Sequence, residues 1–249
     1  MNETDISARA RRLSGNIWQM PTAIRAVAQH SGIDVEALAR RARELGVLGW
    51  VRADDDGAVR LHAEGETEAV DSLLRELDEA PVTEPARVEG HEQFAVRGVP
   101  AGVFVVQEHQ ATAHHFDLRL EVDGVMRSWA VPKGPSMDPV VKRLAVQVED
   151  HSLSHNDYEG RGVIVWDRGI YEQGGRVAWP EALERGHAVF VLHGEKLSGG
   201  FALQRTRGGA KPQWLLIKRR DDHARPGSDV VSERPESVRS GRTLDDTLA

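Results

Sequence analysis

The sequence contains no cysteine, and this absence removes several classes of protein from consideration. Disulfide-stapled domains, Cys-ligated zinc sites, iron–sulfur clusters and thiol nucleophiles all require that residue. Hydrophobic runs are also short, because none approaches the roughly 18 residues of a membrane helix. The N-terminal stretch MNETDISARARRLSG lacks the apolar segment of a secretory signal. Together these absences predict a cytoplasmic protein with no membrane partner.

An excess of positive charge is likewise missing, since the formal net charge is −7. Residues 1–85 hold 10 Lys+Arg against 16 Asp+Glu, whereas residues 86–249 hold 22 against 23. A broad basic surface therefore cannot be the basis for nucleic-acid binding. Any such binding must come from a local site.

The 249 residues, 40% of them hydrophobic, have an ordinary globular composition and are sufficient for one large or two modest domains. The pattern changes along the chain. We predict an α+β N-terminal domain over 1–85, a mainly antiparallel β-barrel over 86–222 and a polar C-terminal tail over 223–249. An antiparallel sandwich is the alternative for the second part.

The N-terminal part combines two amphipathic helices with a hairpin. Apolar residues at helical spacing predict a helix over 34–45, with Asp34 as its N-cap and Gly46 just beyond its end. The stretch GWVRADDDGAVRLHAEG is typical of a hairpin. A second helix is expected over 66–77, and APVTEP at 80–85 is interpreted as a linker.

The C-terminal part is dominated by segments of period two, which is typical of strands. EALERG at 181–186 predicts one short helical turn. The expected strands cover residues 103–109, 114–122, 127–131, 143–151, 163–167, 188–194, 201–205 and 213–219.

Three polar residues of one expected strand carry the chemistry. His115, Asp117 and Arg119 alternate, so they point to one face of the sheet, while the leucines between them point to the other. His109 ends the preceding strand, and a tight connection would bring it beside His115 and Asp117. Two imidazoles and a carboxylate form a metal-ligand set that suits Mn²⁺ or Mg²⁺, and Zn²⁺ also fits.

A second strand repeats this logic. Arg143, Gln147, Glu149 and His151 are predicted to share one face, and polar residues inside a small barrel are costly unless they line a site. Lys133, on a turn after a strand, could reach the same pocket. Cations beside a metal suit a phosphate, which Arg119 can bind with two hydrogen bonds and His151 can hold or protonate.

The stretch FVVQEHQATAHHFDLRLEVDGVMRSWAVPKGPS, followed by RLAVQVEDH, VIVWDRG, LHGEKLSGGFALQR and QWLLIKRRDDHA, resembles the 3′-phosphoesterase module of bacterial DNA ligase D. RPESVRSGRTLDD is similar to the linker that follows that module. The resemblance covers residues 94–245.

This resemblance implies a small β-barrel that uses a divalent metal, preferably manganese, to remove a 3′-phosphate or a terminal ribonucleotide. It further implies that His109, His115 and Asp117 are metal ligands. Arg119 and His151 correspond to the phosphate-binding pair, and Lys133 and Arg143 to supporting basic positions.

The sequence departs from the module at the rim of this site. EQFAVRGVPAG stands where members carry an Arg-Asp-Phe and a Thr-Pro-Glu-Pro segment, His155 replaces a tyrosine, and a Gly-rich loop is reduced to residues 159–162. Because no ligase or polymerase domain is visible, a stand-alone form is expected.

The N-terminal stretch ARELGVLGWVRADDDGAVRLHAEGETEAVDSLLREL is similar to acylphosphatase. Val35 and Ala53 stand where that family has its catalytic Arg and Asn, so the resemblance implies an inactive domain. A winged helix is the alternative, with TAIRAVAQHSG and the next helix forming a helix-turn-helix. The acidic charge of this part opposes DNA binding by such a motif.

These observations favour a metal-dependent 3′-phosphoesterase that trims DNA or DNA–RNA 3′ ends during end-joining repair. One alternative is a catalytically weak module that holds 3′ ends and recruits a DNA ligase or an end-binding repair protein. A third hypothesis is phosphoesterase chemistry on a small nucleotide.

Overall fold

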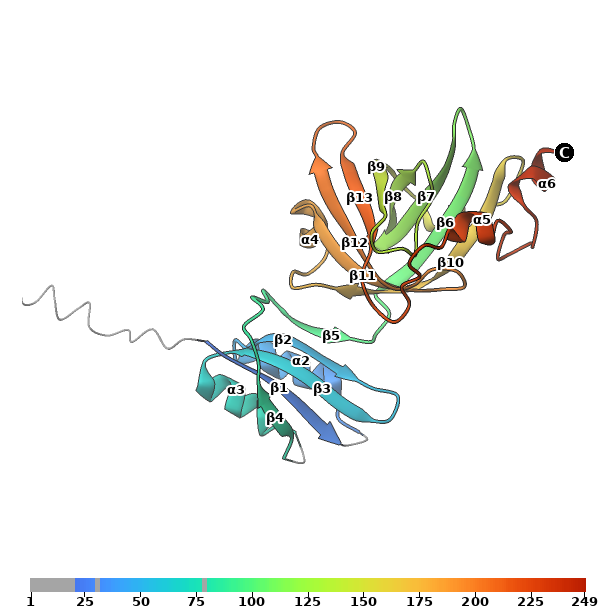
Figure 1. Ribbon diagram of the computed structural model, residues 1–249. Coiled ribbons are helices and arrows are strands. Elements are labelled where there is room, and N and C mark those ends of the chain that lie inside the picture. The colour runs from blue at the N-terminus through green and yellow to red at the C-terminus, as the bar shows by residue number, and fades with distance from the viewer. Residues whose placement is uncertain (1–20, 30–31, 78–79) are drawn as a thin grey trace, which may run out of the picture. The chain divides into compact units, whose positions relative to one another are not determined.

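The computed structural model describes residues 21–29, 32–77 and 80–249, which form two compact units that divide between Val96 and Arg97 (Figure 1). The first is an α+β unit and the second contains a closed antiparallel β-barrel. The predicted fold class is therefore confirmed. None of the helices in the described ranges is long and apolar enough to cross a membrane.

The first unit is a five-stranded sheet with two helices. The strand order is β4-β1-β3-β2-β5. The elements are β1 (Thr22–Gln29), α2 (Val35–Glu44), β2 (Leu48–Ala53), β3 (Ala58–Gly65), α3 (Thr67–Leu74), β4 (Val82–Pro85) and β5 (Phe94–Arg97).

Alternation along β3 defines the two faces of this sheet. Leu61 and Ala63 belong to a core shared with residues of α2 and α3, so the neighbouring His62 and Glu64 lie on the opposite face. The chain crosses that opposite face between the edge strands β4 and β5, since Glu64 accepts hydrogen bonds from the backbone N–H groups of residues 89–91.

The helix predicted over 34–45 is α2, and the Asp34 side chain caps it by accepting hydrogen bonds from the backbone N–H groups of Glu36 and Ala37, each at 3.0 Å. Two other predictions for this part are wrong. Residues 22–29 form a strand between β3 and β4, which excludes the winged helix, and the expected linker at 80–85 contains edge strand β4. Because β5 joins the same sheet, the unit extends beyond residue 85.

The second unit contains all eight expected strands, although β10 runs seven residues past its predicted end. They close in the order β10-β11-β12-β13-β9-β8-β7-β6. The elements are β6 (Gly102–Gln110), β7 (His114–Val122), β8 (Val125–Val131), β9 (Lys142–His151), η1 (Leu153–His155), β10 (Val163–Gly174), α4 (Glu181–Glu184), β11 (His187–Gly194), β12 (Ser198–Arg207), β13 (Gln213–Lys218), α5 (Val230–Glu233) and α6 (Leu244–Leu248).

The interior of the barrel is apolar. One cluster of buried residues draws on every strand and includes Leu118, Leu120 and four tryptophans, Trp129, Trp166, Trp179 and Trp214. Side chains of the opposite parity therefore lie on the outer face of the barrel. A smaller apolar cluster there joins Val105, Met126 and Val165 to Val238.

The segment 223–249, predicted to be a polar tail, is folded against the barrel instead. Its backbone carbonyls at Arg234 and Glu236 accept hydrogen bonds from the buried ammonium of Lys196, and Trp166 Nε1 donates to the Arg234 carbonyl at 2.8 Å. Val238 packs on the small outer cluster. Polar composition misled the prediction because backbone groups provide these contacts.

Candidate active site

The three predicted metal ligands converge on the outer face of the barrel. β6 and β7 pair so that His109 lies opposite His115, and Gln107 lies opposite Asp117. One ligand atom from each of His109, His115 and Asp117 lies within 4.8 Å of the other two. The imidazole rings are 5.0 Å apart between centroids. The period-two argument thus located the cluster, but its expected place inside the barrel is wrong because the apolar side chains fill the interior.

The donor set fits a divalent cation. Asp117 Oδ1 lies 3.5 Å from His115 Nε2, and Asp117 Oδ2 lies 3.8 Å from His109 Nδ1. His115 Nδ1 is 2.9 Å from the carbonyl oxygen of Ala113, so this nitrogen donates and Nε2 keeps the lone pair that a metal needs. Burial, and then the neighbouring His115, lower the pKa of His109, which favours the neutral, ligating form.

Arg119 lies beside the cluster and is held by three side chains. Its Nε donates to Gln107 Oε1 at 3.2 Å, Nη1 to Ser128 Oγ at 2.8 Å and Nη2 to Asp117 Oδ2 at 3.2 Å. The residue is 6% exposed, and burial lowers the pKa of its guanidinium although Asp117 opposes the shift. Since a guanidinium has five N–H groups, two remain for a ligand, which is the number that bidentate phosphate binding uses.

His151 joins the same face through Ser128. A register shift between β8 and β9 places His151 opposite Met126, and its Nδ1 lies 3.3 Å from Ser128 Oγ. The same nitrogen is 2.8 Å from the carbonyl oxygen of Glu149. Nδ1 therefore donates, and Nε2 is the ring atom available to an incoming oxygen.

The remaining two predicted residues are not brought to this cluster by hydrogen bonds or ion pairs within the described ranges. Lys133 is exposed on the turn after β8. Arg143 pairs with Leu216 in the β9–β13 ladder, on the face of the apolar core. The expectation that Arg143 and His151 share a face is wrong, because the irregular β8–β9 register changes the parity of β9. Their catalytic roles stay predictions.

Two residues that organise the site, Gln107 and Ser128, escaped the sequence analysis. Gln107 accepts from Arg119 and donates through Nε2 to the carbonyl oxygens of His155 and Tyr158, both at 3.0 Å. It thereby ties the loop after β9 to the site. Its spacing of two from His109 was a usable signal for a shared face.

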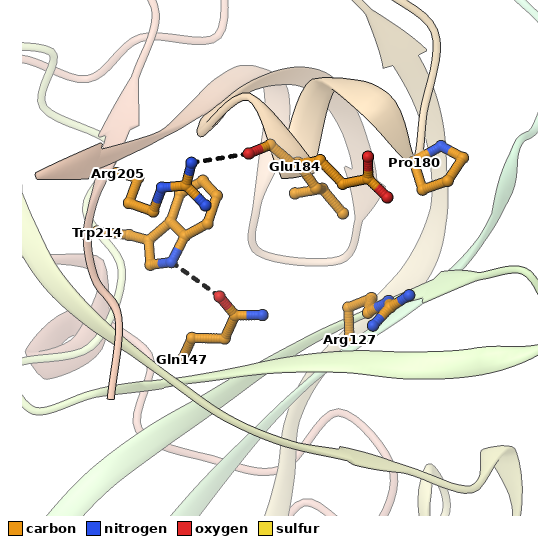
Figure 2. A pocket seen from close by; sticks show the side chains of 7 residues that line it. Arg127, Gln147, Pro180, Glu184, Arg205 and Trp214 are labelled. Carbon is orange, nitrogen blue, oxygen red and sulfur yellow. Dashed lines mark hydrogen bonds between the residues drawn. The ribbon is translucent and has the colours of Figure 1, made fainter. Parts of the chain in front are cut away.

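A separate cavity of about 240 Å³ is lined by none of the predicted metal ligands and by none of the residues assigned to phosphate binding. Figure 2 shows Trp214 Nε1 donating to Gln147 Oε1 at 3.1 Å and Arg205 Nη2 donating to the Glu184 carbonyl at 2.7 Å. Its lining is Arg127, Gln147, Pro180, Leu183, Glu184, Arg205 and Trp214. In both of these hydrogen bonds the donor and the acceptor are groups of the protein itself.

Comparison with known proteins shows that the two parts of the chain resemble two different families. Residues 107–205 match the DNA ligase D 3′-phosphoesterase domain, and residues 35–97 match acylphosphatase. Both resemblances predicted from the sequence are confirmed.

Individual relatives show the same division. The multifunctional non-homologous end joining protein LigD of Pseudomonas aeruginosa is 50% identical over 159 residues, which cover 57% of this chain and 18% of that protein. LigD of Mycolicibacterium smegmatis is 39% identical over 138 residues, covering 49% and 18%. An acylphosphatase of Salinibacter ruber is 58% identical over 50 residues, covering 20% and 50%. The match to each LigD protein thus takes in less than a fifth of that protein's length.

Proposed function

We propose that this protein is a metal-dependent 3′-phosphoesterase that acts on DNA or DNA–RNA ends in end joining. The observation that carries the proposal is the convergence of His109, His115 and Asp117 beside a buried arginine with two uncommitted N–H groups. The LigD relatives, whose names include end joining, support the substrate class.

The metal is proposed to be Mn²⁺ or another divalent cation held by these three residues. When bound, it would polarise the phosphate and lower the pKa of water in the site. Two imidazoles and one carboxylate leave coordination positions for substrate and water. The remaining chemistry belongs to side chains of the protein.

Arg119 is proposed to bind two phosphoryl oxygens and to stabilise the negative charge that develops on them. Its hydrogen bonds to Gln107 and Ser128 fix the orientation of the guanidinium before substrate arrives, so the side chain loses little conformational entropy when the phosphate binds. His151 would present Nε2 to a phosphoryl or leaving oxygen, and when protonated it can donate a proton there. Lys133, on the exposed turn after β8, is proposed to support the charge from the rim. The supporting role of Arg143 stays a prediction, because its position in β9 is on the core face.

The test is a gel assay with a 5′-labelled primer–template that ends in either a 3′-phosphate or a single ribonucleotide. With Mn²⁺, conversion to a 3′-hydroxyl end is expected for the wild type and is lost in Asp117→Ala and His115→Ala. Asp222→Ala, which changes an exposed carboxylate, is the matched control. Full Mn²⁺-dependent activity in the first two variants would show that the site is assigned wrongly.

The same assay addresses the non-catalytic alternative. In the loop after β9, the Glu159 carboxylate already accepts hydrogen bonds from the Val165 backbone N–H and the Ser237 hydroxyl. If neither substrate is converted but a 3′-phosphate end is retained in an Mn²⁺-dependent manner, the site holds ends without cleaving them. Turnover of a free 3′-nucleotide alone would favour a small-molecule phosphoesterase.

A further inference from the structure

A second group of potential metal ligands lies in the N-terminal unit, on the face of the sheet opposite its helices. His62 comes from β3, and Glu89 and His91 come from the segment between β4 and β5. One ligand atom from each of the three lies within 4.8 Å of the other two. His62 is 0% and His91 is 3% exposed, while Glu89 is partly accessible.

The carboxylate of Glu64 organises this group. It lies 2.7 Å from His62 Nε2 and accepts hydrogen bonds from the backbone N–H groups of Glu89, Gly90 and His91 at 2.6, 3.1 and 3.2 Å. Both of its oxygens accept hydrogen bonds from backbone N–H groups, which is the environment that stabilises an ionised carboxylate. An ionised carboxylate can only accept, so His62 Nε2 carries the proton.

The proton on Nε2 leaves the lone pair of His62 on Nδ1. This atom is buried and has no hydrogen-bond partner. Leaving a buried polar atom unsatisfied destabilises the folded state, so such atoms call for an explanation. A histidine whose second nitrogen is held by a carboxylate is the arrangement that orients imidazole ligands toward metals.

The partners of the other two residues agree with this picture. Glu89 Oε2 lies 3.3 Å from His91 Nε2, and the other oxygen, Oε1, lies 3.5 Å from Arg25 Nη2. Arg25 therefore lies beside one oxygen of the carboxylate, while the other oxygen faces His91. The rings of His62 and His91 are 5.4 Å apart between centroids.

We propose that His62, His91 and Glu89 bind a divalent transition-metal ion, with Zn²⁺ the best match. Two imidazoles and one carboxylate belong to its ordinary ligand set, and water completes four-fold coordination. In a tetrahedral site with bonds of about 2.1 Å, ligand atoms lie about 3.4 Å apart. The 3.3 Å between Glu89 Oε2 and His91 Nε2 is close to this separation. The ion would join β3 to the segment that crosses the sheet, which gives it a structural role independent of the barrel site.

The test uses the full chain with the barrel cluster removed by His115→Ala and Asp117→Ala. After equilibrium dialysis against Zn²⁺, metal analysis is expected to find one bound ion per chain in this background. Adding Glu89→Gln keeps the volume of the side chain and is expected to weaken Zn²⁺ binding at least tenfold. Glu84→Gln, on the neighbouring edge strand and exposed, is the matched control and should leave binding unchanged.

A second readout guards against a folding artefact. Zn²⁺ should raise the thermal unfolding midpoint of the background chain and of the Glu84→Gln chain, but not that of the Glu89→Gln chain, whose far-ultraviolet circular dichroism should stay unchanged. A background chain that binds no Zn²⁺, or binding that Glu89→Gln does not weaken, would overturn the proposal. Neither result depends on whether the barrel hydrolyses phosphate esters.

Discussion

The pairing of Arg119 with Asp117 predicts an effect on stability whose size depends on the presence of a metal. In Arg119→Gln, the Asp117 carboxylate, whose side chain is only 10% exposed, loses the cation that lies 3.2 Å away. Removing one partner of a buried ion pair costs about 3–5 kcal/mol. Because this contact is a single hydrogen bond, we expect the lower end, about 3 kcal/mol, at pH 8.

For a unit of this size, 1 kcal/mol shifts the unfolding midpoint by about 2–4 °C, so a fall of about 6–12 °C is expected without metal. Added Mn²⁺ supplies the missing positive charge, so it should stabilise Arg119→Gln more than the wild type. Turnover should nevertheless fall by about 10²–10³, the usual effect of losing one charge-stabilising donor.

Differential scanning fluorimetry with and without Mn²⁺ measures both stabilities. Arg168→Gln is the matched control, because Arg168 pairs with Asp157 at 2.9 Å in an exposed position and should contribute at most about 1 kcal/mol. The reasoning is refuted if Arg119→Gln unfolds within 2 °C of the wild type without metal. It is also refuted if Mn²⁺ stabilises the two proteins equally.

Three further predictions concern other parts of the chain. Burial raises the pKa of Asp167 to about 6, so its neutral form stabilises the fold by about 3 kcal/mol below pH 4, and this contribution is lost as the pH rises through 6. Urea denaturation from pH 4 to 7 should show the loss of stability in the wild type and not in Asp167→Asn. Parallel pH profiles for the two proteins would contradict the prediction. Deleting residues 223–249 removes the carbonyls that hold the buried Lys196 ammonium, so the truncated chain should unfold at least 5 °C lower, and an unchanged midpoint would show that the segment is dispensable. The N-terminal unit should not hydrolyse an acyl phosphate in a spectrophotometric assay. The Asp34 carboxylate already accepts hydrogen bonds from the backbone N–H groups at the start of α2, and Val35 replaces the expected Arg. Hydrolysis that survives Asp117→Ala would refute this prediction.

The barrel was predictable because its strands alternate between core and outer face. Residues 115–122 illustrate this, since their buried apolar residues and their polar residues occupy opposite parities. The strand over 22–29 was missed because TAIRAVAQ is rich in alanine and resembles a helix locally. Its state is decided by pairing with β3, which lies more than thirty residues later.

The residues of the candidate site were predictable from the same alternation of side chains along a strand. Ligands on adjacent strands could be found from spacing, but the face of His151 could not, because an irregular register reverses parity without a mark in the sequence. The cluster around His62 was missed for a related reason. Glu89 and His91 lie in an irregular segment, and only the crossing of the sheet brings them to β3.

In the barrel, the spacing of the three clustered residues and the structure of the surrounding loops are set by different parts of the chain. The spacing of His109, His115 and Asp117 is set by a backbone ladder within a closed cylinder, which has no free edge along which a strand could slip. The loop after β9, whose His155 and Tyr158 carbonyls accept hydrogen bonds from Gln107, is not part of that ladder and can vary in length without changing it. Such a protein can acquire a new preference for what it binds while the distances that govern its chemistry are inherited unchanged.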